Sequence, residues 1–143
     1  MSNSSLMQLE IVSAESSIYS GQISHAIVCG QQGDLGIHPG HTALLSPLKA
    51  GQVEVSLPSG EVKVFYVSSG IAEVQPKMLT ILADTAKRAE DIDEAAAMAA
   101  KEAAEKRVAE QQAGIDHSQA LAELAEAAAQ LKALHALRRR AKR

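Results

Sequence analysis

The residues of this chain that could carry out chemistry gather in one stretch, GDLGIHPGHTALL, which spans residues 33–45. Asp34 beside His38 or His41 could form a carboxylate–imidazole pair of the kind used in general base catalysis. A hydrolase also needs a nucleophile, and Thr42 lacks the G-x-S-x-G surroundings of an activated hydroxyl. We therefore interpret this stretch as a non-catalytic loop.

A second chemistry open to the stretch is zinc binding, with His25 added to the two histidines and Asp34 as ligands. Pro39 and Gly40 separate the two histidines, which excludes the helical presentation of an H-E-x-x-H site. The chain has a single cysteine, so it contains no C-x-x-C pair. We predict that the protein holds no metal ion and no cofactor.

A third possibility is a phosphate cradle built from Gly30, Gly33 and Gly36. The chain has no G-x-x-x-x-G-K-[ST] pattern, and no helical pattern follows these glycines to supply an anion-binding helix N-terminus. The simpler interpretation is that the glycines and the Pro-Gly pair make turns between strands. Leu44 and Leu45 are then expected to return the chain to the core.

Composition restricts the class of protein. The 143 residues are 46% hydrophobic and carry a net charge of −3, which is typical of a folded globular protein. No apolar run approaches the roughly 20 residues of a membrane-spanning helix, and Cys29 is expected to be a buried small hydrophobe. Three aromatic residues are too few for the stacking platforms of single-stranded nucleic-acid binding. We expect a cytoplasmic protein that contacts a membrane only through a partner.

The first part of the chain, residues 6–84, has the pattern of an antiparallel β domain. Short β-branched or alternating runs such as SHAIVCG, QVEVSL and VKVFYV are separated by turns rich in glycine and proline. This pattern predicts a β-sandwich or a barrel. In the clearest hairpin, three apolar residues of one strand are expected to face three of the next: Val53, Val55 and Leu57 against Val62, Val64 and Tyr66.

From residue 89 onward alanine replaces glycine and proline, and the pattern becomes helical. Gly114 separates two helices, and Asp116 is the predicted N-cap of the second. Each helix should be about 30–35 Å long. The sequence therefore predicts a mainly β plus α fold, with an antiparallel β-sandwich over residues 1–88 and an antiparallel two-helix hairpin over residues 89–143.

The contacts of this hairpin are expected to use small side chains. The first helix should present a set of alanines to its neighbour: Ala95, Ala96, Ala99, Ala100 and Ala103. The second helix carries a leucine stripe: Leu121, Leu124, Leu131, Leu134 and Leu137. Because alanine removes little area from water, we expect the hairpin to detach without unfolding the sandwich.

Charge is distributed unevenly over the helical part. Residues 90–126 carry ten carboxylates and three bases, a net charge of −7, whereas residues 132–143 carry six bases and no acid, a net charge of +6. The terminal RRRAKR could be a solvated end or an arm for nucleic acid, anionic lipid or a carboxylate-rich protein surface. The charge pattern does not choose among these.

Several motifs together resemble a known family. In chain order they are LEIVSAE (residues 9–15), GDLGIHPGHTALLSPLKAG (33–51), SSGIAEVQP (68–76) and LTILADTAKRAEDID (79–93), followed by an alanine-rich hairpin. This order, over essentially the whole chain, resembles the epsilon subunit of bacterial F-type ATP synthases. The resemblance implies a β-sandwich followed by two helices.

The same resemblance implies a function without catalysis. Members of this family are subunits of the central rotor stalk that couple proton flow to ATP synthesis, and they bind the gamma subunit and the ring of c subunits. Membrane association is then peripheral, on the cytoplasmic face of the bacterial inner membrane, and nucleic acid is no partner. The residues at the family's contact positions for gamma and the c-ring are Ser13, Gln32, Asp34, His38 and His41.

The resemblance also implies a conformational switch. In the family the helices alternate between a hairpin folded on the sandwich and an extended form that meets the alpha and beta subunits and blocks ATP hydrolysis. The corresponding inhibitory residues here are Leu134, Arg138, Arg139, Arg140, Lys142 and Arg143.

Some members also bind ATP at an [IL]-D-x-x-R-A motif. Ile92 and Asp93 match it, but Ala96 stands where the motif has arginine. Alanine cannot bind or neutralise phosphate, which argues against nucleotide binding by this chain.

Overall fold

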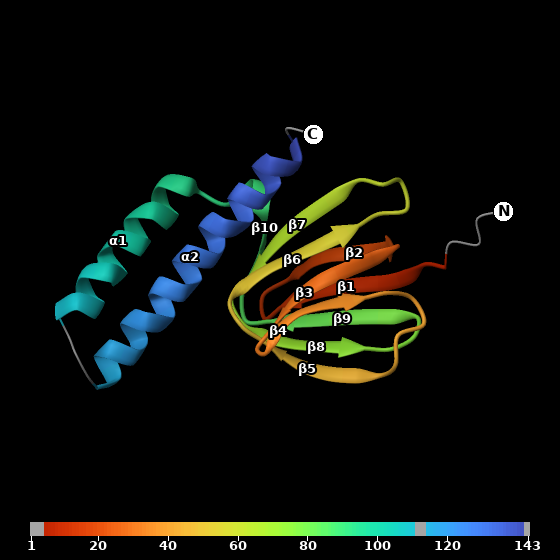
Figure 1. Cartoon of the computed structure of the whole chain (residues 1–143), viewed down its shortest axis with the longest axis horizontal. Coiled ribbons are helices and arrows are strands. Elements are labelled where there is room, and N and C mark those ends of the chain that lie inside the picture. The colour runs from red at the N-terminus through yellow and green to blue at the C-terminus, as the bar shows by residue number, and fades with distance from the viewer. Residues whose placement is uncertain (1–4, 111–113, 142–143) are drawn as a thin grey trace.

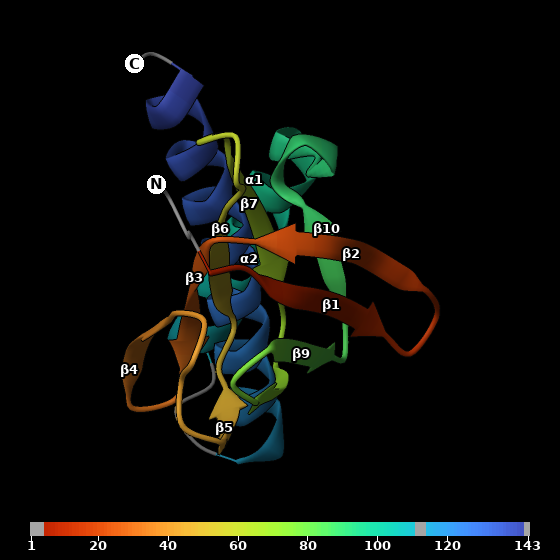
Figure 2. The ribbon, with the colours of Figure 1, turned by 90° about the vertical axis from the view of Figure 1, so that its right-hand side faces the viewer.

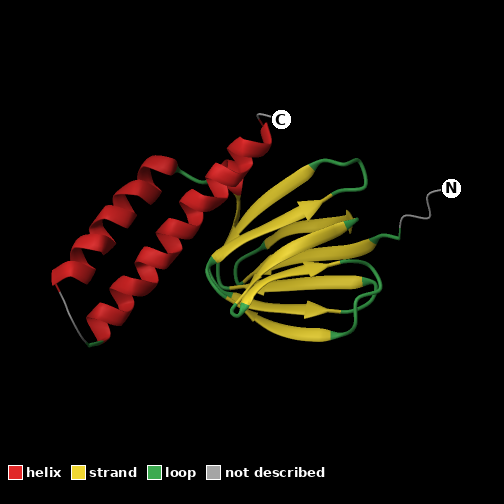
Figure 3. Ribbon diagram, in the orientation of Figure 1, coloured by secondary structure: helices red, strands yellow, loops and turns green. Residues whose placement is uncertain are grey.

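Ten strands followed by two long helices make up the part of the chain that the computed structural model describes, residues 5–110 and 114–141 (Figure 1). The strands form one body, and the helices form a hairpin on one side of it (Figure 3). The predicted fold class, an antiparallel β-sandwich followed by a two-helix hairpin, is confirmed.

The ten strands are paired into one continuous sheet. Their bounds are β1 Met7–Ser13, β2 Ser17–Ile23, β3 His25–Gly30, β4 Gly33–Ile37, β5 Leu44–Leu48, β6 Gly51–Ser56, β7 Val62–Val67, β8 Gly70–Val74, β9 Met78–Ala83 and β10 Ala86–Arg88. The order is β10-β7-β6-β3-β5-β8-β9-β1-β2, with β4 paired to β3. Since β3 meets β5 at the single pair Gly30–Leu48, the sheet folds there into two layers. One layer is β10-β7-β6-β3-β4, and the other is β5-β8-β9-β1-β2.

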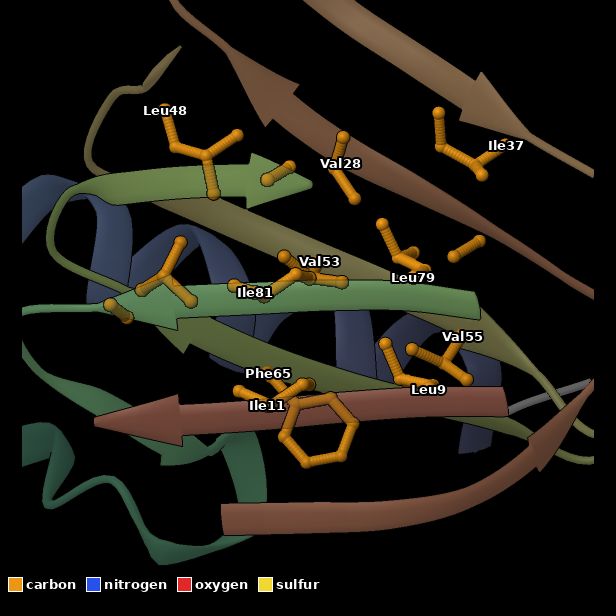
Figure 4. Close-up of a cluster of buried hydrophobic side chains, with 14 of the residues drawn as sticks. Leu9, Ile11, Val28, Ile37, Leu48, Val53, Val55, Phe65, Leu79 and Ile81 are labelled. Carbon is orange, nitrogen blue, oxygen red and sulfur yellow. The ribbon is translucent and has the colours of Figure 1, made fainter. Parts of the chain in front are cut away.

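The main core lies between these layers. Alternate side chains of each strand point inward and interdigitate, as expected for a sandwich (Figure 4). The fully buried members come from both layers: Leu9, Ile11, Val28, Val53, Val55, Phe65, Leu79 and Ile81. Tyr19 packs on Phe65 with ring centroids 5.5 Å apart, so two of the three aromatic residues contribute to this core.

The β6–β7 hairpin is present, but the predicted facing of its residues is wrong. Val53 pairs with Phe65, which is not one of the three β7 residues that were predicted to face it. Phe65 and Val67 point into the main core, whereas Val64 and Tyr66 point outward and belong to a second buried cluster. A strand that is buried on both faces has no polar alternation from which its inward face could be read.

The second cluster is covered by the last helix. The helical part consists of a short 3-10 turn η1 Ala89–Asp91, then α1 Glu94–Glu110 and α2 Ile115–Ala141. α2 packs on β6, β7 and η1 (Figure 2). Its buried residues there are mostly small: Ala129, Ala133, Leu134 and Ala136. Burial under this helix raises the pKa of Tyr66 to about 12, while a hydrogen bond from Gln130 limits the rise.

The two helices differ in length, although two helices of equal length were predicted. With 17 and 27 residues, α1 is about 25 Å long and α2 about 40 Å. α2 begins at Ile115, so Asp116 lies inside its first turn and is not the N-cap. At α1, the Asp93 carboxylate accepts a hydrogen bond from the Ala96 amide at 3.1 Å and caps the helix.

The alanines that contact α2 are not the predicted ones. The five alanines expected at this contact are exposed, and Ala97 and Ala104 are buried instead. On α2, Leu121 is exposed although it belongs to the predicted apolar stripe. In a segment with alanine at most positions, no periodic contrast marks the contact face, so small rotations of the helix are equally compatible with the sequence.

Gly70, the first residue of β8, is the glycine on which the sheet depends most. Its φ of +150° is unfavourable for other residues, and a Cβ there would lie 2.0 Å from the carbonyl oxygen of Leu82. We expect Gly70→Ala to lower the free energy of unfolding by more than about 2 kcal/mol. Thermal unfolding monitored by circular dichroism measures this change.

Gly36→Ala is the matched control, because a Cβ at Gly36 would meet nothing within 4 Å. Its midpoint of unfolding should stay close to that of the wild type. Equal midpoints for both variants would contradict the close approach of β7–β8 to β9.

Candidate functional site

The acid and the histidines of the GDLGIHPGHTALL stretch do not form one site. Asp34 lies in β4, opposite Cys29 of β3, and β4 continues to Ile37. An extended strand rises about 3.3 Å per residue, so the backbone positions of Asp34 and His38 are about 13 Å apart. This separation is too long for a hydrogen bond between their side chains, so Asp34 cannot orient His38 as a general base.

Each histidine has a different local partner. His38 stacks on His25, with ring centroids 5.0 Å apart and an interplanar angle of 16°. The Nε2 atom of His25 lies 3.1 Å from the hydroxyl of Ser56. The Nδ1 atom of His41 lies 2.6 Å from the carbonyl oxygen of Thr42, to which it donates. Within residues 5–110 and 114–141, no group of three or more His, Cys, Asp or Glu side chains is placed to hold a metal ion.

Gly33 and Gly40 shape the turns of the stretch, as the sequence predicted, whereas Gly36 lies within β4 and makes no turn. Gly33 and Gly40 have positive φ angles of 134° and 87°, which only glycine adopts without strain. The Gly40 amide donates to the Pro76 carbonyl at 2.7 Å, and the His41 amide donates to the His38 carbonyl at 3.1 Å. These bonds fix the loop after β4 against the β8–β9 turn.

The prediction that Leu44 and Leu45 return the chain to the core is wrong. Both side chains are exposed, and Leu45 is 66% accessible. They lie at the start of β5, which pairs with β8 at an outer position of the sheet. Leu48, three residues later, is the β5 residue that enters the core.

Leu45 lies beside a larger apolar surface that the sequence reading missed. Four residues are in register across four adjacent strands and point away from the core: Pro47, Ile71, Leu82 and Val12. We call them the outward apolar row. Ile71 is 43% exposed and Leu82 49% exposed. The signal that could have found the row is in β8 and β9, where the buried residues Ala72 and Ile81 are each followed or preceded by one exposed apolar residue, Leu82 after Ile81 and Ile71 before Ala72.

Polar side chains border this row on β1 and β2. Glu10 accepts hydrogen bonds from Gln8 at 3.0 Å and Ser20 at 2.9 Å, and Gln22 donates to Gln8 at 3.0 Å. An apolar patch with a polar rim is typical of a protein–protein contact surface.

The residues at the family's gamma and c-ring positions are spread over three places. Ser13 closes the β1–β2 turn, where its hydroxyl accepts the Ser16 amide at 3.3 Å. Gln32 is exposed in the β3–β4 turn, next to Asp34. His38 and His41 lie beyond the other end of β4. The structure therefore does not gather these residues into one cluster.

Asp34 borders a groove between the sandwich and α2. The groove has a volume of about 480 Å³, and its charged or polar lining residues are Asp34, Lys49, Gln52 and Lys132. The Gln52 Oε1 atom is buried without a hydrogen-bond partner among the described residues. The groove separates the rim of β4 from the small side chains of α2.

Cys29 lies at the floor of this groove and is 3% exposed, which confirms its predicted burial. Its thiol donates to the Lys49 carbonyl at 3.3 Å. Burial, with the charge of Asp34 acting in the same direction, raises the pKa of this thiol to about 11. The thiol is therefore protonated at neutral pH and poorly nucleophilic.

The basic end of α2 is held in place in this conformation. Arg138 pairs with Glu94 of α1, and Arg140 pairs with Glu54 of β6. Leu134 is 7% exposed and belongs to the second cluster. Arg139 is exposed. Two further inhibitory candidates, Lys142 and Arg143, lie outside the described residues.

The residues of the nucleotide motif have structural roles here. Ile92 is buried in the second cluster, and Asp93 caps α1. Ala96 is exposed and presents only a methyl group.

Comparison with known proteins identifies the family. The model of the ATP synthase delta/epsilon chain β-sandwich domain matches residues 6–89, and the model of the long α-helix domain of the same chain matches residues 90–135. This chain belongs to the ATP synthase delta/epsilon family. The resemblance derived from the sequence motifs is thus confirmed.

Bacterial members of the family are similar over nearly the whole chain. The ATP synthase epsilon chain of Alkalilimnicola ehrlichii is 52% identical over 139 residues, 97% of this chain and 99% of that one. The epsilon chain of Teredinibacter turnerae is 53% identical over 133 residues, 92% of this chain and 94% of that one. Because coverage is nearly complete on both sides, the similarity includes the sandwich and the helices.

Chains in two solved ATP synthase structures share the fold. A chain of the mitochondrial ATP synthase of Euglena gracilis, solved with OSCP, F1 and the c-ring, superposes with a TM-score of 0.82 at 21% identity. The match covers 92% of this chain and 82% of that chain. A chain of the central stalk and c-ring of the Tetrahymena thermophila mitochondrial enzyme gives a TM-score of 0.59 at 15% identity, with 90% and 96% covered.

Neither of the two long helices could span a membrane. Among the described residues, no helix combines the required length with sufficient apolar character.

The single cysteine of the chain allows a clean test of the groove. With a pKa near 11, the Cys29 thiol is about 100-fold less ionised at pH 8 than an ordinary cysteine, and burial slows its reaction further. We expect alkylation of the native protein by iodoacetamide at pH 8, followed by mass spectrometry, to be at least about 100-fold slower than in urea. Similar native and denatured rates would contradict burial of Cys29 beneath the groove.

Proposed function

We propose that this chain is a non-catalytic rotor subunit of a proton-translocating F-type ATP synthase. In this role it helps to couple proton flow to ATP synthesis and inhibits ATP hydrolysis through its extended C-terminal helix. The observation that carries the proposal is the similarity at 52% identity, over 97% of the chain, to a protein named ATP synthase epsilon chain. The proposal includes a peripheral location on the cytoplasmic face of the bacterial inner membrane.

The proposal divides the chain into two working parts. Residues 1–88 form the rotor-binding sandwich, and residues 89–143 form the mobile regulatory hairpin. In support, the second cluster that joins them is made mainly of alanines, whereas the sandwich has its own continuous core. A part with its own core retains its fold when the other part detaches.

The outward apolar row is the proposed contact for the gamma subunit. It lies on the layer β5-β8-β9-β1, whereas α2 packs on β6 and β7 of the other layer. The subunit can therefore stay bound to gamma while the hairpin is folded or released. Ser13, at the end of the strand that carries Val12, lies next to this contact.

The rim of β4 is the proposed contact for the c-ring. Gln32, Asp34 and His38 are exposed along it, and His41 follows in the loop. An exposed carboxylate at an interface rim affects the rate and specificity of association more than the stability of the subunit. We place Asp34 in that role, opposite basic or amide groups of the ring.

The basic end of α2 is the proposed inhibitory element. When extended, it would reach the alpha and beta subunits and meet carboxylates there. Six basic residues without an acid in residues 132–143 suit this contact. Nucleotide binding is not part of the proposal, because Ala96 replaces the arginine of the motif.

The contact with gamma can be tested by charge insertion. We expect Ile71→Lys combined with Leu82→Lys to weaken binding to the gamma subunit at least about tenfold, because charges would enter an apolar interface. Both side chains are about half exposed in the free subunit, so its midpoint of unfolding should change little. Co-purification with gamma and isothermal calorimetry measure binding.

Leu121→Lys is the matched control, since Leu121 is an exposed leucine of α2 at 45% accessibility. It should bind gamma as the wild type does. Normal binding by the Ile71/Leu82 variant would exclude the outward apolar row as the gamma contact.

Removal of the basic tail tests the inhibitory role. Deletion of residues 138–143 should raise ATP hydrolysis by the assembled enzyme several-fold, because the carboxylates of the head lose their partner. Assembly should remain intact, since the sandwich is unchanged. Unchanged hydrolysis, with the complex assembled, would contradict inhibition by this tail.

A further inference from the structure

Two arginines near the end of α2 are held by carboxylates from different elements. Arg138 donates two hydrogen bonds to Glu94, from Nη1 to Oε1 at 3.1 Å and from Nη2 to Oε2 at 2.5 Å. Arg140 donates from Nη2 to Oε2 of Glu54 at 3.1 Å. Glu94 is the first residue of α1, and Glu54 is in the middle of β6. The end of α2 is therefore tied to both the first helix and the sandwich.

The two arginine side chains extend in different directions from α2. Residues two positions apart on a helix are about 200° apart around its axis. Arg138 accordingly reaches toward α1 while Arg140 reaches toward the sheet. Paired, double hydrogen bonds such as those of Arg138 are among the stronger side-chain interactions.

The other ion pairs of the described residues do not join the helices to the sandwich. Arg107 pairs with Glu123 between α1 and α2, and Lys101 pairs with Glu105 within α1. Among the ion pairs between described residues, the Arg140–Glu54 pair alone links a helix to a strand. The side chain of Glu54 is 17% exposed, so this pair is the least hydrated of them.

The ion pair between Arg138 and Glu94 is present at neutral pH. The hydrogen bonds from Arg138 hold the pKa of Glu94 below its ordinary value, and the charges of Arg138 and His135 act in the same direction. A lowered pKa in the folded hairpin means that the stabilisation is complete above the ordinary pKa of glutamate. It is lost as the pH falls through the lowered value.

We propose that Glu54 and Glu94 form a latch that holds Arg138 and Arg140 in the folded hairpin and so withholds them from the catalytic head. The proposal rests on the proposed function, in which these arginines are inhibitory. Extension exchanges the carboxylates of this chain for carboxylates of the head. The strength of the latch therefore sets the fraction of subunits that can extend.

The latch can be tested on the isolated full-length subunit without any partner. Trypsin needs an unfolded backbone, so cleavage after Lys132, which lies between the buried residues Ala129 and Ala133, follows the population in which this part of α2 is released. We expect Glu54→Gln and Glu94→Gln each to raise this rate about two- to fivefold, the range of exposed ion pairs. The double variant should show about a tenfold rise. Added salt should accelerate cleavage of the wild type more than that of the double variant.

Glu105→Gln is the matched control, because it removes an ion pair that lies entirely within α1. It should leave cleavage of α2 unchanged. Equal cleavage rates for the double variant, the control and the wild type would overturn the latch. An increase with the control as large as with the latch variants would also overturn it.

ATP hydrolysis by the assembled enzyme distinguishes a failure of the latch from a failure of the inhibitory role. With the double variant, ATP hydrolysis should fall about two- to fivefold, because more subunits extend. Faster cleavage of the isolated subunit together with unchanged hydrolysis would retain the latch and overturn inhibition by these arginines. Unchanged cleavage would overturn the latch whatever the hydrolysis rate.

Discussion

The contact of α2 with the outer face of β6 and β7 relies on small side chains, and the behaviour of the whole molecule depends on it. Ala129, Ala133 and Ala136 supply most of the helix side, with Leu134 as its one large buried residue. A buried methyl-sized group contributes about 0.8 kcal/mol, compared with about 1.5–3 kcal/mol for a buried leucine or isoleucine. The contact is therefore close but weak per residue, whereas the sandwich below it is filled by leucine, isoleucine, valine and phenylalanine. Such a difference allows the hairpin to open while the strands remain paired.

The two layers of the sandwich have different outer surfaces, one covered by α2 and one left open by the described residues. The outer face of β6 and β7 is covered by α2, which buries Val64 and Tyr66. The outer face of β5, β8, β9 and β1 carries the outward apolar row, which no described element covers. A rotor contact on the second face leaves the first face free to hold or release the hairpin. Ion pairs at the end of α2 add to the alanine contact that holds the hairpin on the first face.

The sequence predicted the architecture well and the facing of individual residues less well. Turn signals and helix formers are local, so the strand-rich part, the hairpin and the turn glycines could be predicted from them. The facing of Val64 and Tyr66 could not, because β7 is buried on both sides and its apolar run shows no alternation. The exposure of Leu44 and Leu45 was missed because an exposed apolar side chain has the same chemistry as one in the core. The partners of Arg138 and Arg140 lie 44 and 86 residues away along the chain, beyond any local pattern.

Native-state hydrogen exchange on the isolated subunit tests the central claim most directly, namely that the hairpin opens independently of the sandwich. Amide protons of α1 and α2 should exchange through an opening at least about tenfold more populated than the opening that exposes β1, β9 and the other core strands. Addition of salt should increase exchange in the helices alone. Exchange of helices and strands through a single opening of the same free energy would show one cooperative unit and would contradict the account.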